Sequence, residues 1–230
     1  MKVMHITRKR NIQNAVYTLG DTLLSSVTSY KYLGIVIGSN LSWNIQVDAI
    51  TARASRLLGF IRVVARGSST SAIFALYKAL VLPILEYGIP AWHPNTLKQT
   101  QQLERIQRIA TRVALKQRRG EMPYEERLRV LNWSTLSARR DYLLCSFTFK
   151  CLYFCCDCET LIENIAISKR RLFTLSFIHQ QSRTQALFLS ASRRFPRVWD
   201  ELPLEVRDAS VVSSLSSFLL SMKRSLLDSN

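Results

Sequence analysis

The sequence predicts an α+β protein that is mostly helical, with a short N-terminal antiparallel β-hairpin region followed by two helical units. The first 40 residues alternate between apolar and polar side chains, as strands do, and contain a turn dipeptide at Gly20-Asp21. From Trp43 onward, apolar residues recur with the period of an α-helix. The chain has 230 residues and only 7 glycines, so long flexible linkers are not expected.

Four segments at the N-terminus have the alternating pattern of β-strands. A basic loop, RKRNIQN, follows the first of them, and Gly20-Asp21 joins the second to the third. We expect these short strands to form a small antiparallel set and no large sheet. The segments are KVMHIT (2–7), AVYTL (15–19), TLLSSV (22–27) and KYLGIVI (31–37).

A first helix is expected from Trp43, with Ser42 as its N-cap and Gly67 just beyond its end. Its apolar residues step by three and four along the chain and therefore share one face. Several arginines lie off that face. The apolar residues are Val47, Ile50, Ala54, Leu57, Ile61 and Val64, and the arginines are Arg53, Arg56, Arg62 and Arg66.

A second helix should begin in the Ser-Ser-Thr-Ser run over residues 68–71. It carries apolar residues up to Val81, and Pro83 should kink or end it, because proline lacks the backbone N–H that a helix interior needs. Pro90 and Pro94 then indicate a loop.

A third helix is expected over residues 97–118, with cations aligned on one face. Like charges at this spacing repel each other by a few tenths of a kcal/mol per pair, so a helix that carries them often faces an anion. The alternative is a basic face that is simply solvated. The five cations are Arg105, Arg108, Arg112, Lys116 and Arg119.

Gly120 and Pro123 separate this helix from a further helical region. Shorter helices are expected over residues 124–132, from Ser134, and over 213–227, whereas residues 155–194 are less regular. The expected domains are therefore a β region (1–41), a helical domain (42–119) and a helical C-terminal module (120–230).

The charge balance indicates a polyanionic partner. Lys and Arg total 32 against 16 acids, which gives a formal net charge of +16 and an isoelectric point near 10.2. Nucleic acid and an anionic membrane surface both fit, and a merely solubilising surface is the plain alternative. Because the basic residues are locally clustered, the sequence favours nucleic acid.

The compartment is predicted from apolar runs and cysteines. The longest apolar run, residues 72–85, is interrupted by Lys78 and Pro83 and falls short of the ~18 residues of a membrane helix. The N-terminal segment MKVMHITRKR has too short an apolar stretch for a signal peptide, so none is expected, and the five cysteines, an odd number, are crowded between Cys145 and Cys158. These features favour a cytoplasmic or nuclear protein without a membrane span.

A catalytic or metal site is not predicted. No phosphate-binding GxxxxGKS, dinucleotide-binding GxGxxG, GxSxG or HExxH motif occurs, and the three histidines lie far apart. Glu125-Glu126 reads as a surface pair beside arginines. The cysteine cluster, with His179 as the one nearby imidazole, fits core packing better than a zinc site. The four tryptophans fit core anchors better than base-stacking residues. No cofactor is expected.

Five segments in fixed order resemble one protein family. They are YKYLGIVI, LSWNIQVDAITARASRLLGFIR, LYKALVLPILEYGIPAWHP, LERIQRIATRVA and RRFPRVWDELPLEVRDASVVSSLSSFLLSMKRSL. Together these segments resemble the region after the catalytic palm, and the C-terminal end, of reverse transcriptases from non-LTR (LINE-type) retrotransposons. The jockey and chicken-repeat-1 groups are the most similar.

The resemblance implies a role for each part of the chain. Tyr32, Leu33 and Gly34 match the hairpin that ends the palm and contacts the primer backbone, the primer grip. The helices up to Arg119 match the thumb, which follows the template–primer duplex, and Lys2 matches a palm lysine. Phosphate contacts are then expected from Arg53, Arg56, Arg105, Arg108, Arg112 and Lys116.

The departure from the family concerns catalysis. The family's palm holds Mg²⁺ with a paired-aspartate motif, and this sequence contains no Asp-Asp. We therefore expect a fragment of an RNA-directed DNA polymerase that has no polymerase activity alone. The alternatives are a genomic relic, or a structural or interaction fragment that lacks its palm and fingers and self-associates through Tyr17, Tyr30 and Ile35.

Overall fold

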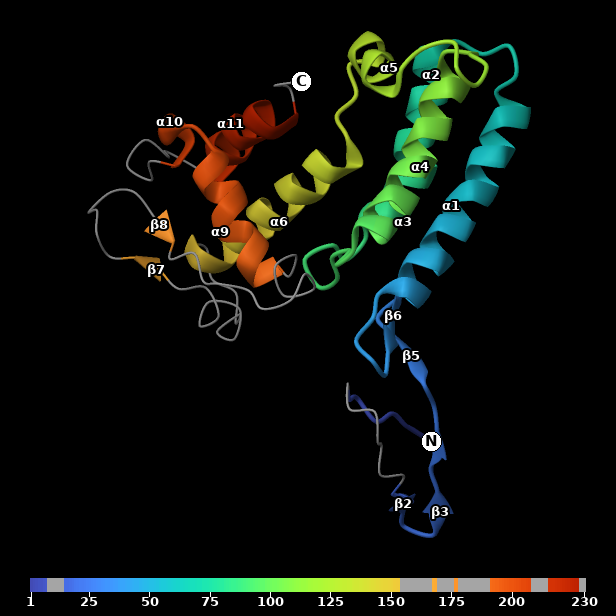
Figure 1. Cartoon of the computed structure of the whole chain (residues 1–230), viewed down its shortest axis with the longest axis vertical. Helices are drawn as coiled ribbons and strands as arrows, with labels where there is room; N and C mark the ends of the chain where they lie inside the picture. The colour runs from blue at the N-terminus through green and yellow to red at the C-terminus, as the bar shows by residue number, and fades with distance from the viewer. Residues whose placement is uncertain (8–14, 154–166, 169–175, 178–190, 208–214, 228–230) are drawn as a thin grey trace.

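The computed structural model describes residues 1–7, 15–153, 167–168, 176–177, 191–207 and 215–227 (Figure 1). A narrow β arm at the N-terminus extends away from a helical bundle, and the C-terminal helices lie beside that bundle (Figure 1). The predicted class, α+β and mostly helical, is confirmed.

The outer part of the arm contains four strands of two residues each. They are β1 (Lys2–Val3), β2 (Thr18–Leu19), β3 (Thr22–Leu23) and β4 (Ser25–Ser26). β2 and β3 form the predicted antiparallel hairpin around Gly20-Asp21, with Gly20 in the left-handed region at φ 58°. β1 pairs with β4 in parallel, which corrects the expected all-antiparallel set.

The segment KYLGIVI is a hairpin, so the single strand expected over residues 31–37 is wrong. β5 (Ser29–Tyr32) and β6 (Ile35–Gly38) pair antiparallel on either side of a two-residue turn. The turn residues, Leu33 and Gly34, have φ values of 44° and 85°. Positive φ at both positions is the signature of a type I′ turn, which matches the twist of the flanking strands.

Three helical rods form the bundle. The first is α1 (Asn44–Val64), the second consists of α2 (Thr70–Leu76) and α3 (Leu82–Glu86) in succession, and the third is α4 (Leu97–Ala114). The Gln99 side-chain amide donates a hydrogen bond to Asn44 Oδ1 at 2.7 Å, which joins the first turns of α1 and α4. These two helices therefore run in the same direction, and the α2–α3 rod, which runs in the opposite direction, connects them along the chain (Figure 1).

The buried face of α1 is rotated slightly from the predicted stripe. Val47, Ala54 and Ile61 are fully buried as expected, whereas Val64 is 60% exposed. Thr51, Leu58 and Ala65 are buried as well, and the predicted Ile50 and Leu57 are half-buried against the core. Burial of Thr51 is possible because its hydroxyl donates to the Val47 carbonyl at 2.7 Å, so no polar group is left without a partner. Trp43, not Ser42, occupies the N-cap.

A π-helical turn allows the second rod to continue past its proline. Ser69 caps α2 by accepting from the Ala72 N–H, and residues Tyr77–Val81 then form a π-helical turn. In this turn the Leu82 N–H bonds to the carbonyl of Tyr77. The helix continues through Pro83 to Glu86, so the proline coincides with a distortion of the rod without ending it.

The third rod is shorter than expected. α4 ends at Ala114, four residues before the predicted end at Arg118. Lys116 adopts a left-handed conformation at φ 56°, and the Gln117 N–H bonds back to the Arg112 carbonyl at 3.0 Å. This is the Schellman arrangement that closes many helices. Lys116 and Arg119 therefore do not continue the helical row of cations.

The remaining described elements form the C-terminal part. They are α5 (Tyr124–Leu131), α6 (Leu136–Tyr153), β7 (Ile167–Ser168), β8 (Ser176–Phe177), α9 (Ala191–Glu201), α10 (Leu204–Arg207) and α11 (Leu215–Leu227). One hydrophobic core fills the bundle and extends to Leu136 at the start of α6. A second core begins at Leu144 on the same helix and includes Trp199 and Phe218. The predicted domain limits, 42–119 and 120–230, stay predictions, and the cores divide within α6.

Most of the predicted anchors are buried. Trp92, Trp133 and Trp199 lie in the two cores, and Trp43 packs against the first. Cys145 and Cys151 are buried, as core residues, and burial raises the pKa of the Cys145 thiol. The remaining members of the proposed cysteine cluster, Cys155, Cys156, Cys158 and His179, lie outside the described residues.

Candidate nucleic-acid interface

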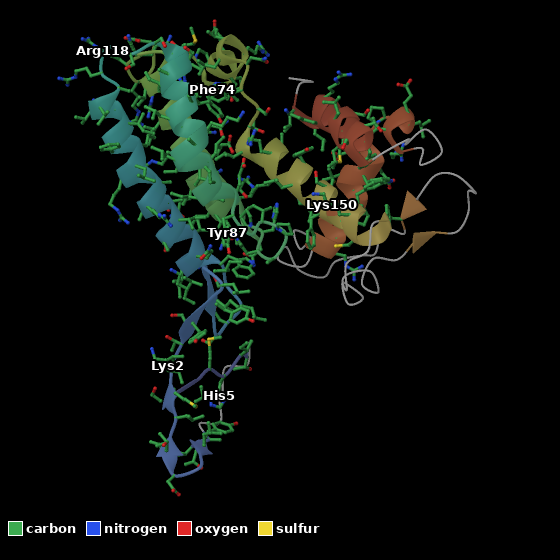
Figure 2. All side chains as sticks on the ribbon, turned by 180° about the vertical axis from the view of Figure 1, so that it is seen from behind. Lys2, His5, Phe74, Tyr87, Arg118 and Lys150 are labelled. Carbon is green, nitrogen blue, oxygen red and sulfur yellow. The ribbon has the colours of Figure 1, made fainter. Side chains whose placement is uncertain are left out.

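A cleft of about 880 Å³ lies where α1 and α4 end side by side. The last turns of both helices and the loops that follow them form its walls. Its lining residues are Gly59, Ile61, Arg62, Val63, Ala65, Arg66, Gly67, Ile73, Ile109, Arg112, Val113, Lys116, Gln117, Arg118 and Arg119. Figure 2 shows Arg118 at the end of the bundle opposite the arm, and Tyr87 at the arm end.

The cleft is strongly positive. Six of its lining residues are Arg or Lys, and none is acidic. None of these six cations forms an ion pair within the part of the chain that the structure describes. Uncompensated cations that converge on a hollow create a positive potential that attracts anions. The cleft is therefore suited to phosphate groups.

Two local features bring the cations together. Arg62 is in the last turn of α1, Arg66 follows just beyond the end of that helix, and Arg112 is in the last turn of α4. The Schellman closure then turns the chain, so that Lys116 and the residues after it bend back over the helix end. The Arg118 N–H donates to Glu121 Oε2 at 2.8 Å, which fixes this loop.

A smaller hollow of about 300 Å³ adjoins the cleft on the outer side of α4. It is lined by Arg105, Arg108, Ile109, Arg112 and Arg119, of which the last three also line the cleft. The Arg108 guanidinium lies 5.1 Å from the centre of the Tyr124 ring, a cation–π contact that orients the guanidinium. The two hollows together make one continuous basic surface.

Part of this clustering has a structural reason. The carbonyl ends of two helices meet here, and cations at a helix C-terminus contribute typically 0.3–1 kcal/mol each. One or two cations per helix would serve that purpose. The six cations around this cleft are more than helix stabilisation needs. The additional cations must therefore be solvated or bind an anionic partner.

A buried arginine stands beneath this surface. Arg127 of α5 donates from Nε to the Thr111 hydroxyl at 3.0 Å and from a terminal nitrogen to the Met122 carbonyl. Burial, and next the positive charge of Arg112, lower the pKa of Arg127. Arg127 holds α5 against α4 and is not accessible to a ligand.

The structure brings together some predicted phosphate contacts and not others. Arg112 and Lys116 line the cleft, and Arg105 and Arg108 line the adjoining hollow. Arg53 and Arg56 are exposed on α1 and line neither. Sequence reasoning did not assign the cleft residues Arg62, Arg66 and Arg118 to the site, and it placed Arg119 in the cation row without giving it a phosphate contact. The parallel course of α1 and α4 and the turn at Lys116 bring these four residues to one cleft.

The residues matched to a primer grip lie at the other end of the bundle. Tyr32 ends β5, and Leu33-Gly34 forms the tight turn that follows. All three residues are exposed. This turn and the basic cleft lie at opposite ends of α1, so one nucleic acid must extend along the bundle to contact both.

Among the described residues, no group of three or more His, Cys, Asp or Glu side chains is arranged to hold a metal ion. Glu125 and Glu126 are exposed, as expected for a surface pair. None of the described helices has the length and apolar character needed to cross a membrane. No protein-family model, curated protein or solved structure matches the chain.

Proposed function

We propose that this chain is a non-enzymatic, thumb-like and C-terminal fragment of a non-LTR retrotransposon reverse transcriptase that binds template–primer duplex without sequence preference. The observation that carries the proposal is the cleft with six cations, no acid and no ion pair among its described members. Such a surface contacts phosphates, which are the same for every sequence. The family assignment itself rests on the five resembling segments.

The expected mode of binding follows from the layout. Arg105, Arg108 and Arg112 lie along one side of α4 and can contact successive phosphates of a duplex that lies on the bundle. The exposed turn at Leu33-Gly34 would contact the duplex at the far end of the bundle. Arg53 and Arg56 remain predicted contacts for a duplex that also covers the outer face of α1.

The test is binding of the purified chain to a fluorescent RNA–DNA hybrid across a salt series. The logarithm of affinity should fall with the logarithm of salt concentration, by about 0.9 per phosphate neutralised on duplex DNA. The double variant Arg112→Gln/Lys116→Gln should weaken binding and flatten the slope by about 2, as expected for two lost phosphate contacts.

The matched control removes the same charge outside the cleft. Lys78→Gln/Lys150→Gln should change affinity much less, because both lysines are exposed and neither lines the cleft or the adjoining hollow. Equal losses in both double variants would indicate attraction by net charge alone. Wild-type affinity in the cleft variant would exclude the cleft as the binding site.

The proposal includes an absence of polymerase activity in the chain alone. It rests on the lack of any Asp-Asp pair in the sequence, since the family's palm holds Mg²⁺ with such a pair. Primer extension on a primed RNA template, with Mg²⁺ and deoxynucleotides, measures this directly. Extension by the purified chain would contradict the proposal.

A second candidate function is an interaction fragment, and the exposed arm favours it. Large apolar side chains are exposed along the arm, including Val16, Tyr17, Leu19, Leu23, Tyr30, Tyr32 and Leu33. Exposed apolar patches often mark interaction surfaces. Of the three residues expected to mediate self-association, Tyr17 and Tyr30 are exposed, whereas Ile35 packs against the bundle core.

A further inference from the structure

Gly59 lies inside α1, near its C-terminal end, without a conformational or packing reason. Its backbone is helical, and a Cβ added there would meet no atom within 4 Å. Five of the other six glycines have positive φ, and Gly38 has an atom of Asn40 within 3.1 Å of its Cβ position. Glycine is also a much weaker helix former than alanine. Its presence here therefore calls for an explanation outside the fold.

The position of Gly59 beside the cleft explains why a glycine occurs there. Gly59 lines the basic cleft, and Arg62 and Arg66 follow it along the same wall. The missing side chain leaves the α1 backbone open to the cleft at that point. Glycine is the residue that allows a backbone to approach a ligand closely.

The size of the cleft limits what can enter it. A volume of 880 Å³ falls in the range of about 300–1,000 Å³ that is typical of sites for drug-sized ligands. A B-form DNA duplex, whose major groove alone is about 12 Å wide, must lie across such a cleft. A few nucleotides of one unpaired strand fit inside.

The residues that line the cleft indicate whether the bases or the sugar–phosphate backbone of a strand would contact the protein. No aromatic side chain lines the cleft, so the bases have no stacking platform there. Cations suited to phosphates are present, together with apolar Val63, Ile109 and Val113, which can contact sugars. The sugar–phosphate backbone therefore faces the protein.

We propose that the cleft holds a short unpaired strand, with its sugar–phosphate backbone against Gly59 and its phosphates on the surrounding cations. This inference rests on the proposed nucleic-acid binding and names the form of the ligand at the cleft. The duplex lies along α4, and the strand that continues beyond the duplex enters the cleft.

The experiment compares two fluorescent RNA–DNA hybrids, one blunt and one with a short single-stranded extension. The variant is Gly59→Leu, which fills the open space, and the matched control is Ala49→Leu, an exposed position on the same helix outside the cleft. Gly59→Leu should lose about tenfold in affinity for the extended hybrid, as when one or two charge-assisted contacts are lost. Its affinity for the blunt hybrid, and both affinities of Ala49→Leu, should stay at the wild-type level.

Thermal unfolding separates this inference from a structural role for the glycine. Leucine and alanine favour helix more than glycine, so Gly59→Leu and Gly59→Ala should melt no lower than wild type. A lower melting temperature in both variants would show that the glycine serves packing and would overturn the inference.

The outcomes also separate this inference from the proposed function. Wild-type affinity of Gly59→Leu for the extended hybrid, with a loss in Arg112→Gln/Lys116→Gln, overturns the inference alone. Wild-type binding by both variants overturns the proposed use of the cleft as well.

Discussion

The hydroxyl of Tyr87 donates a hydrogen bond to the backbone carbonyl of Leu33, with an oxygen–oxygen distance of 2.9 Å. Tyr87 follows α3, and Leu33 is in the β5–β6 turn, so this bond fixes the base of the arm to the bundle. A second link joins them where the Val36 N–H donates to the buried side chain of Gln46 at 2.9 Å. The position of the turn is therefore set by the helices and not by the strands alone.

Tyr87→Phe should loosen the arm without unfolding the bundle. The lost hydrogen bond contributes about 0.5–1.5 kcal/mol, toward the lower end because the side chain is more than half exposed. Amide hydrogen exchange over residues 29–38 should accelerate, while exchange in α1 and α4 stays unchanged. Tyr30→Phe is the matched control, because the Tyr30 hydroxyl has no partner among the described residues. Equal acceleration in both variants would show that the bond contributes nothing.

Gly34→Ala should destabilise the arm more than Gly20→Ala. Both glycines have positive φ, which costs an L-residue about 1–2 kcal/mol. The alanine methyl at position 34 would also lie 3.1 Å from the Tyr87 ring, whereas at position 20 it meets nothing within 4 Å. Hydrogen exchange across each hairpin measures the difference. Equal effects would mean that the tyrosine ring moves aside freely.

Stability should fall as the pH is lowered from 8 to 5, partly because of His93. Burial, and next the charges of Arg194 and Arg140, lower the pKa of His93 to about 3. The unfolded chain binds this proton below pH ~6.5 and the folded chain does not, so His93 alone lowers the free energy of unfolding by about 2 kcal/mol at pH 5. Urea unfolding of His93→Gln at both pH values should show a smaller change. An unchanged pH dependence would exclude His93 as its source.

Association through the arm should depend on its exposed leucines. If the arm mediates self-association, wild type will form larger species as concentration rises, and Leu19→Glu/Leu23→Glu will sediment as a monomer. Leu97→Glu/Leu204→Glu is the matched control, because these leucines are equally exposed on helices outside the arm. Sedimentation velocity distinguishes the cases. A wild-type monomer at all concentrations would contradict the interaction function.

The sequence predicted the helices better than the strands. Helical periodicity located α1, the start of α4 and α11, because each buries a continuous face along many residues. The alternation in KYLGIVI suggested one strand, since the pattern does not show that Leu33 and Gly34 adopt positive φ. The end of α4 was also missed because Lys116, and not a glycine, takes the left-handed position.

The candidate site was predictable only in part. The cation row on α4 could be read from spacing, and Arg105, Arg108 and Arg112 do share one side of that helix. The cleft could not be predicted from the sequence, because it depends on the relative direction and the packing of α1 and α4. α9 was not predicted either, since Pro196 lies inside it and its arginines obscure its apolar face.

The helix α6 belongs to both hydrophobic cores, and this has a consequence for cooperativity. Leu136 packs in the bundle and Leu144 in the C-terminal core, so neither core can melt without exposing part of α6. The Glu86–Arg139 and Asp141–Arg194 ion pairs add contacts from the same helix to both sides. A destabilising substitution at Trp199 or Phe218 should therefore also lower the stability of the bundle, and the two cores should unfold in one transition.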